Sequence, residues 1–416
     1  MEKFGIIIVR SIFLKRNLLF LWVGHVISHA GDSIYQLALP WLVLELTGSK
    51  TTTSLVALCA YLPAVLFSLL AGVFADRFNR RSVMMFSDAA RMVVMLALVG
   101  FLLSGGTSPV VVGLIAFVVA SFATLFYPAR DALVPDLVPQ EALMSANAFI
   151  STSGQFAHLA GPLLAGLLVA VVGLTHLFTI DALSFAASLI CLALISLRRT
   201  TVHQPESHAR GHLSDLIEGL RYVWRERSLG LFILLTALNN LFIMGPAIIG
   251  IPIFVREVLV LDFKAFAIIE ACMAGGMLIG SFLVWRFGTS LNPALVLFVG
   301  MLLDGLTYSL LFITETYAQT RVLLLIHGLG IPMITISRTT MIQTVVHYQF
   351  RGRVFSMVNL SVIGLTAVSA ALVGPLAEVI PIATVFLGIG LAAAACGLVG
   401  LSHRGMMRLV PDERGE

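Results

Sequence analysis

Four polar residues recur at helical spacing inside a long apolar segment near the start of the chain. Their spacing of i, i+4, i+7 and i+11 places them on one face of a helix. Ionisable groups are unfavourable in hydrocarbon, so this face is expected to look into a water-accessible cavity. The four residues are His25, His29, Asp32 and Gln36.

Asp32 is the first candidate for proton coupling. It lies about 15 residues into its segment, near mid-depth of a membrane at the helical rise of 1.5 Å per residue. A carboxyl group at that depth is a candidate to take up and release a proton during a functional cycle. Together with His25 and His29 it also allows a second interpretation, a metal site with cation transport as the function.

Other charged residues lie within apolar segments. Asp88 and Arg91 are one helical turn apart and are expected to neutralise each other. Asp181 is a candidate for lining the same cavity. Glu270 and Asp304 are further candidates for proton coupling or for contact with a cationic substrate.

Sequence motifs for other mechanisms are absent. The chain has no Gly-x-x-x-x-Gly-Lys-Ser/Thr phosphate loop, no Gly-x-Ser-x-Gly elbow and no His-Glu-x-x-His pair. These absences argue against direct use of ATP and against a membrane-embedded enzyme, and we expect no cofactor. The four cysteines lie far apart and match neither a disulfide framework nor a metal site. They are Cys59, Cys191, Cys272 and Cys396.

The composition is that of a membrane protein. Of 416 residues, 58% are hydrophobic and 12% charged, and the mean hydropathy is +0.98. A soluble domain carries about 25% charged residues, so most of this surface faces something other than water. The net charge of +4 does not indicate nucleic-acid binding, because the basic residues cluster at the ends of apolar segments.

The apolar segments predict twelve transmembrane helices. A helix needs about 20 residues to cross the hydrocarbon layer. The pattern gives an all-α integral membrane fold, with a lipid bilayer as its surroundings. The predicted spans are 17–45, 53–75, 83–104, 109–128, 144–172, 175–197, 229–256, 264–286, 293–313, 320–341, 354–379 and 382–402.

The basic residues predict the orientation. With the N-terminus in the cytoplasm, 21 Lys and Arg residues fall on the inner side and four on the outer side, with Arg91 inside a span. This asymmetry predicts that both termini are cytoplasmic, and it requires an even number of spans. The outer four are Lys50, Arg256, Lys264 and Arg321.

One long connection, 198–228, divides the chain into predicted bundles at 1–197 and 229–416. Its second half, 214–225, has an amphipathic pattern that predicts a tether helix at the membrane surface, with a regulatory site as the alternative. A shift of 208 residues aligns the halves at several points and places Asn240 opposite Asp32. Two six-helix bundles related by duplication are a plan typical of transporters. Asn239 and Asn240 join the candidates for lining the cavity.

The loop after the second predicted span carries a cluster of charges on the inner side. Its Gly allows close approach of a neighbouring helix, and its acid and arginines could latch two bundles together in one conformation and release them in another. The alternative is a basic loop that only sets topology. The latch candidates are Gly72, Asp76, Arg77, Arg80 and Arg81.

In the fifth span, small residues flank a proline, which allows a kinked helix to pack closely and to flex. The hinge candidates are Gly161, Pro162 and Gly166. A packing motif without a functional role is the alternative.

These motifs resemble those of a known family. The loop pattern G-x-x-x-D-R-x-x-R-R resembles the signature of the major facilitator superfamily, and the fifth span resembles its antiporter motif. Three further stretches resemble the branch that holds macrolide efflux pumps and the enterobactin exporter: the Gly31-Asp32 segment, Arg351-Gly352-Arg353-Val354-Phe355, and the linker's Glu218-Gly219-Leu220-Arg221.

The resemblance implies a transporter that exports small molecules by alternating access. We expect a monomer in the cell inner membrane, with protons as the coupling ion because of Asp32. The first hypothesis is proton-coupled efflux of amphiphilic molecules or drugs. The second is dedicated export of an endogenous product such as a siderophore, or movement of a lipid. A sensor built on a transporter scaffold is a third possibility.

Overall fold

The computed structural model describes residues 16–196, 220–288 and 291–407. Over these residues the chain is helical and contains no strand, so the predicted all-α fold is confirmed. The described residues form two compact units. We call residues 1–47 with 59–208 unit 1, and residues 48–58 with 209–416 unit 2.

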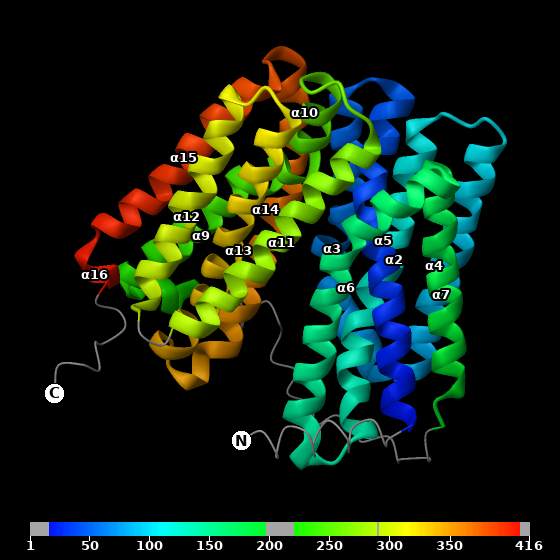
Figure 1. Cartoon of the computed structure of the whole chain (residues 1–416). Coiled ribbons are helices and arrows are strands. Elements are labelled where there is room, and N and C mark those ends of the chain that lie inside the picture. The colour runs from blue at the N-terminus through cyan, green and yellow to red at the C-terminus, as the bar shows by residue number, and fades with distance from the viewer. Residues whose placement is uncertain (1–15, 197–219, 289–290, 408–416) are drawn as a thin grey trace. The chain divides into compact units, whose positions relative to one another are not determined.

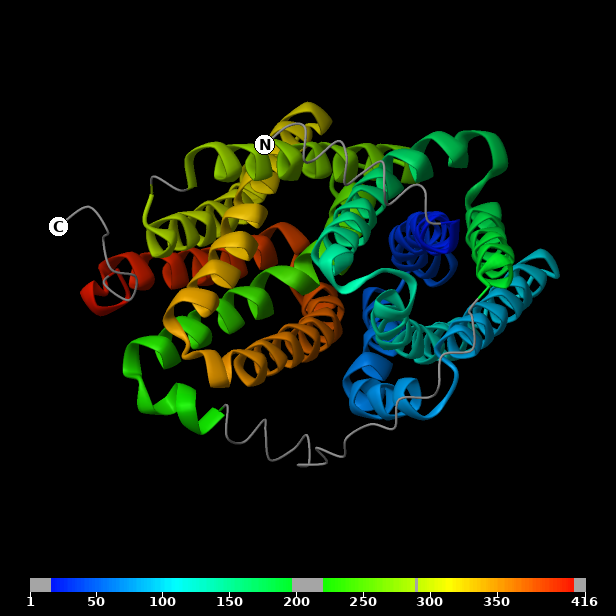
Figure 2. The ribbon, with the colours of Figure 1, turned by 90° about the horizontal axis from the view of Figure 1, so that it is seen from below.

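Unit 1 is built from the first six long helices (Figure 1). Helix α2 lies between α6 and α7, and α4 packs against α5 and α7 (Figure 2). The helices and the short 3₁₀ turn are α2 (Arg16–Thr47), α3 (Lys50–Arg77), α4 (Arg80–Leu103), α5 (Pro109–Leu137), η1 (Gln140–Ala142), α6 (Leu143–Val172) and α7 (Leu174–Leu194).

Unit 2 contains a second set of long helices. Its first segment is α9 (Arg227–Gly245), which continues through one π turn, η2 (Pro246–Gly250), into α10 (Ile251–Glu257). The others are α11 (Phe263–Phe287), α12 (Pro293–Leu310), the 3₁₀ turn η4 (Leu311–Ile313), α13 (Tyr317–Val345), α14 (Tyr348–Val379), α15 (Ile382–Ser402) and the short α16 (Arg404–Met407). Here α11 packs on α13, α12 packs on both α13 and α15, and α9 packs on α14.

Eleven helical segments of the described chain are long and apolar enough to cross a membrane, counting α9 to α10 as one. Helix α2 is not among them, although at 32 residues it is one of the two longest helices described. Polar side chains, among them His25, His29 and Asp32, interrupt the apolar sequence along the middle of α2. With α2 included, the described chain has the twelve long helices that the sequence predicts.

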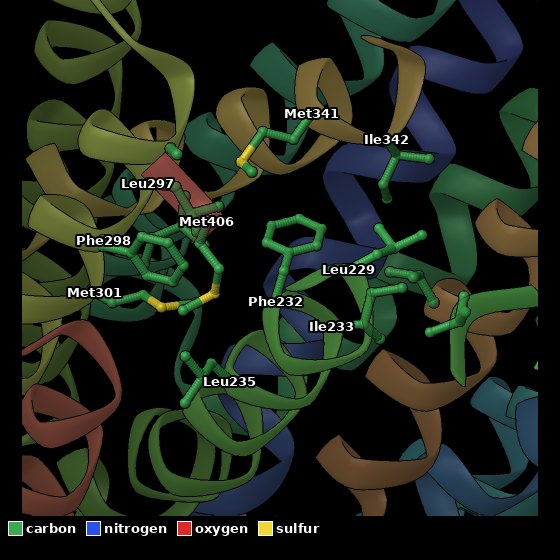
Figure 3. Close-up of a cluster of buried hydrophobic side chains, with 14 of the residues drawn as sticks. Leu229, Phe232, Ile233, Leu235, Leu297, Phe298, Met301, Met341, Ile342 and Met406 are labelled. Atoms are coloured by element: carbon green, nitrogen blue, oxygen red, sulfur yellow. The ribbon is translucent and has the colours of Figure 1, made fainter. Parts of the chain in front are cut away.

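Each unit has an apolar core near its helix ends. In unit 2, Phe232 and Leu229 of α9 pack with Met301 of α12 and Ile342 of α13 (Figure 3). In unit 1, an equivalent cluster contains Leu21, Met84, Phe126 and Leu133. Because lipid is as apolar as these side chains, close packing rather than escape from water holds the helices together.

The linker prediction falls partly outside the described residues. Of the predicted tether helix 214–225, the structure describes Leu220–Arg225, which are helical. Val223 is buried in the core of unit 2, whereas Leu220 and Trp224 are exposed. The Tyr222 hydroxyl accepts a hydrogen bond from the backbone N–H of His347 at 3.2 Å, which ties this helix to the start of α14.

The first residues of α3 pack within unit 2, although the rest of the helix belongs to unit 1. The Glu378 carboxylate on α14 accepts hydrogen bonds from the backbone N–H groups of Lys50 and Thr51 at 3.0 and 3.3 Å. It thereby satisfies two donors that the start of a helix leaves unpaired. The Lys50 ammonium in turn lies 2.7 Å from the Glu257 carboxylate.

Candidate functional site

Buried charged side chains gather in the middle of unit 1, where α2, α4 and α7 meet. Asp32 comes from α2, Asp88 and Arg91 come from α4, and Asp181 comes from α7. All four residues are buried, and 11% of the Asp32 side chain is exposed while that of Asp88 is fully covered. Three carboxyl groups thus surround one guanidinium in an apolar interior.

Arg91 is paired first with Asp32. Its Nη2 donates a short hydrogen bond to Asp32 Oδ1, and its Nη1 lies 3.6 Å from Asp88 Oδ1. The sequence suggested that Arg91 and Asp88 neutralise each other, because they lie one turn apart. The structure instead gives Arg91 a nearer partner on another helix, so this ion pair joins α2 to α4.

Helix α7 completes the surroundings of the pair. The Arg91 guanidinium lies 4.0 Å from the centroid of the Phe185 ring, a favourable cation–π distance. Ser184, next to Phe185, donates a hydrogen bond at 2.7 Å to the backbone carbonyl of Asp181, one turn earlier in α7. A side chain at Gly31 would collide with Ser184, so this glycine allows α2 to approach α7 closely enough to cover Asp181.

The two histidines of α2 lie beside a different set of groups. His25 Nε2 is 3.0 Å from Arg130 Nη1, and the rings of His25 and His29 both contact Tyr127 edge-on. Across from them, a Cβ at Gly154 of α6 would lie 3.1 Å from each imidazole. A guanidinium next to the imidazole nitrogen opposes a bound cation. Among the described residues no group of three His, Cys, Asp or Glu side chains is placed to hold a metal ion.

The four residues of the predicted polar face of α2 differ in their exposure. His25 and Asp32 are buried, His29 is half-buried and Gln36 is exposed. The helix therefore buries its charged residue and presents its amide at the surface of the unit. A role for these residues in lining a cavity stays a prediction.

Unit 2 has its own buried polar cluster. Asn239 Nδ2 of α9 donates to Asp304 Oδ2 of α12 at 3.1 Å, and His327 Nδ1 of α13 lies 3.1 Å from Asp304 Oδ1. Thr307 Oγ1 lies 3.0 Å from the same imidazole nitrogen. His327 could not be singled out from the sequence, because a lone histidine in an apolar segment forms no pattern.

The other two candidates of unit 2, Asn240 and Glu270, do not contact the Asp304 cluster through any hydrogen bond or ion pair among the described residues. Asn240, which the 208-residue shift aligns with Asp32, turns to α14 and donates to Val362 O and Thr366 Oγ1, both at 3.1 Å. Its neighbour Asn239 therefore holds the position that contacts α12. Glu270 of α11 is buried, and no ion pair joins it to another described side chain.

Of the latch candidates, the arginines make contacts within unit 1. Arg80 pairs with Asp136 at the end of α5 at 2.7 Å, a partner that the sequence did not single out. Arg81 donates to the carbonyl oxygens of Leu192 and Ala193, both at 2.7 Å, and so caps the C-terminus of α7. Arg77 is exposed. Gly72 and Asp76 lie in α3, and the surroundings of both residues fall outside the described part of the chain.

The hinge candidates lie in α6, which contains Pro162 within the helix. A Cβ at Gly161 would collide with Ser33 of α2, so this glycine sets a close approach between α6 and α2. Gly166 is buried. The matching glycine of α14, Gly374, approaches the start of α3, and its N–H donates to Ser54 Oγ at 2.7 Å.

Comparison with known families identifies the fold. The family model described as the Major Facilitator Superfamily matches residues 21–370. The chain belongs to the major facilitator superfamily. This membership confirms the resemblance inferred from the loop after the second span and makes the protein a multi-pass membrane transporter rather than an enzyme.

Several curated relatives of this superfamily member are named as efflux proteins. Macrolide efflux protein A of Streptococcus pyogenes is 27% identical over 343 residues, which cover 81% of this chain and 83% of the relative. The multidrug efflux pump Tap of Mycobacterium tuberculosis (strain ATCC 25618 / H37Rv) is 27% identical over 382 residues, or 89% of this chain and 90% of Tap. The predicted branch is therefore consistent with the relatives.

Solved structures of low sequence identity share the fold. The nucleoside transporter NupG matches with a TM-score of 0.71 at 13% identity, covering 92% of this chain and 98% of NupG. A bacterial homologue of the iron transporter ferroportin in an inward-facing state matches with a TM-score of 0.70 at 17% identity, covering 93% of this chain and 99% of the homologue.

Proposed function

We propose that this transporter exports small amphiphilic organic molecules, drugs among them, in exchange for protons. The observation that carries the proposal is the ion pair between Asp32 and Arg91, which is buried between two helices. Two of the chain's relatives, macrolide efflux protein A and Tap, are named as efflux proteins and support it. Charges inside a membrane are retained where they serve transport, because lipid opposes them strongly.

The charge balance of the unit 1 cluster supports proton coupling. Asp32, Asp88 and Asp181 exceed Arg91 by two negative charges when all are ionised. Uncompensated charge in a low-dielectric interior costs several kcal/mol per ion, so binding of protons relieves it. Asp32 is the entry point in this scheme, because its side chain is the one that retains exposure.

The proposed cycle is alternating access between two bundles. Asp76 with Arg77, Arg80 and Arg81 would act as the inner latch, and the Gly161-Pro162 bend of α6 would act as the hinge. The contacts of Arg80 and Arg81 within unit 1 support a fixed platform on which such a latch is built.

We also propose that both termini are cytoplasmic, that the protein works as a monomer and that it resides in the cell inner membrane. The 21-to-four distribution of basic residues supports the orientation. Labelling of single cysteines with an impermeant maleimide tests it: a cysteine at Lys50 is expected to react in intact cells, and one at Arg404 only after lysis. The reverse pattern would overturn the orientation.

Efflux is tested with the purified protein in liposomes. Ethidium and erythromycin serve as probes, and their transport is measured with and without an imposed pH gradient. The proposal predicts transport that depends on the gradient and that loses this dependence in Asp32→Asn. Transport of neither probe, together with movement of a siderophore or a lipid, would support the second hypothesis instead.

A further inference from the structure

Asp88 is a buried acid that lacks well-formed hydrogen bonds. Its side chain is fully covered, Ser188 lies beside it, and neither carboxylate oxygen makes a hydrogen bond of ordinary geometry. Arg91 Nε, close by, is likewise buried without an acceptor. Buried polar groups are normally satisfied, so an acid and a guanidinium N–H left over at one site require an explanation.

The geometry offers Arg91 a second partner. Its Nη2 is bound to Asp32, while its Nη1 is 3.6 Å from Asp88 Oδ1. Charge-assisted N–H···O bonds are about 2.7–2.9 Å long, so a shift of less than about 1 Å would complete a bond to Asp88. The guanidinium carbon of Arg91 lies over the Phe185 ring, 4.0 Å from its centroid, and a shift of this size keeps it within cation–π distance of the ring.

We propose that Arg91 exchanges Asp32 for Asp88 when Asp32 takes up a proton, and that Asp88 is the positioning residue that keeps the guanidinium paired in the protonated state. The inference rests on the proposed function in one respect, the entry of the proton at Asp32. The proton comes from water that reaches the exposed edge of Asp32, and an O–H bond forms there. No other covalent bond changes.

Asp88 is what makes protonation of Asp32 compatible with a buried arginine. A neutral Asp32 no longer balances Arg91, and within 4 Å of the guanidinium the described residues offer one other carboxylate, Asp88. Removing one member of a buried pair is strongly destabilising, because the remaining charge has no partner. With Asp88 in place the exchange replaces one ion pair by another.

Other titratable groups surround the pair at longer range. Helix α6, which also packs on α2, contributes His158 alone, and the side chain of His158 lies outside the described part of the chain. Asp181 is the acid most similar to Asp88 in burial, but its contact is with Ser184, and it makes no ion pair with Arg91. The groups in electrostatic reach of the pair are His29 and Tyr35 on α2, Tyr127 on α5, and Asp181 on α7.

A double-mutant cycle on thermal unfolding tests the exchange. Asp32→Asn imitates the protonated side chain, so the purified full-length protein is compared as wild type, D32N, D88N and D32N/D88N in detergent. We expect each single variant to keep one carboxylate for Arg91, and the double variant to lose about 5 °C more in Tm than the sum of the singles. Adding Arg91→Met should recover that extra loss, because it removes the unpaired charge.

D32N/D181N is the matched control, with the same two charge changes in the same cluster. Its effects should add to within about 1 °C. Additive behaviour of D32N/D88N, or equal non-additivity of D32N/D181N, would overturn the exchange. If D32N/D88N yields no folded protein, D32N/D88E decides: a retained carboxylate should restore folding, and failure to do so contradicts the proposal.

Because the cycle uses neither a substrate nor a pH gradient, it can succeed even if proton-driven efflux fails. A second test, which does depend on transport, measures the rate of ethidium transport as a function of pH. D88N should shift the profile toward lower pH by about one unit or more, D88E should restore it, and an unshifted D88N profile would contradict the positioning role.

Discussion

The two units link the same pair of helices with different chemistry. In unit 1 the first and third long helices, α2 and α4, are joined by an ion pair between Asp32 and Arg91. In unit 2 the corresponding helices, α9 and α12, are joined by a hydrogen bond from the Asn239 amide to Asp304. Both units therefore carry a polar link between these two helices, but its chemistry differs, and its residues in unit 2 are not those that the 208-residue shift aligns with Asp32 and Arg91.

This difference indicates that protonation affects the polar link of unit 1 more than that of unit 2. An amide cannot change its charge, and Asp304 has an imidazole beside it with which a proton can be shared. In unit 1 the balance depends on one guanidinium among three acids, so a single proton changes which groups are paired. We infer that unit 1 carries the coupling, while the link in unit 2 mainly fixes its helices.

Removal of Arg91 is expected to have the largest effect on the contrast between the two units. Arg91→Met leaves Asp32 and Asp88 buried without their cation, which should destabilise the protein by about 3–5 kcal/mol and abolish probe transport. Thermal unfolding and liposome transport measure the two effects. The variant Asp32→Asn with Asp88→Asn and Arg91→Met should recover stability without recovering transport, and recovery of transport would contradict the assignment of coupling to this cluster.

Helices α6 and α14 each contain a Gly-Pro pair whose glycine allows a neighbouring helix to pack closely. Substitution of these glycines tests this packing in each unit. Gly161→Ala drives a methyl group into Ser33 of α2, and Gly374→Ala drives one into the Lys50 carbonyl at the start of α3. Forced overpacking costs about 1–3 kcal/mol, so both variants should unfold at lower temperature. Gly364→Ala, at a position of α14 with no atom near a new Cβ, is the matched control. Loss of stability in the control as large as in Gly374→Ala would refute the steric account.

The substitution Asp304→Asn tests whether unit 2 also takes part in proton coupling. The change keeps an acceptor for Asn239 and removes the charge next to His327, so a loss of about 1–2 kcal/mol in stability is expected. Transport of ethidium should slow by a few fold while keeping its dependence on the pH gradient. Complete loss of the gradient dependence would show that the two units contribute equally and would remove the contrast drawn between them.

The smallest effect is expected at the start of α3. Glu378→Gln weakens a charged acceptor for two helix N–H groups but keeps an amide oxygen in its place, which should lower stability by about 1 kcal/mol or less. Because the site is exposed, the difference from wild type should shrink further in 0.5 M salt. A salt-independent loss would mean that Glu378 acts through packing rather than charge.

Sequence alone predicts much of the fold and less of the site. The helices could be predicted because long apolar segments are visible in the sequence. The 208-residue repeat is visible there as well, and it led us to expect two bundles. The partner of Arg91 could not be predicted in this way. Asp88 lies one turn away and looks like the obvious choice, but the packing of α2 against α7 at Gly31 brings Asp32 closer. His327 and Asp136 gave no signal, since each gains its role only from a residue on another helix.

The most direct test of the central claim measures protons. Liposomes containing the protein and the pH dye pyranine receive ethidium, and the pH change that accompanies its transport is recorded for wild type, Asp32→Asn and Asp304→Asn. We predict that wild type and Asp304→Asn move protons opposite to ethidium, and that Asp32→Asn moves none. Proton movement by Asp32→Asn equal to that of the wild type would contradict the coupling role of the charged cluster in unit 1.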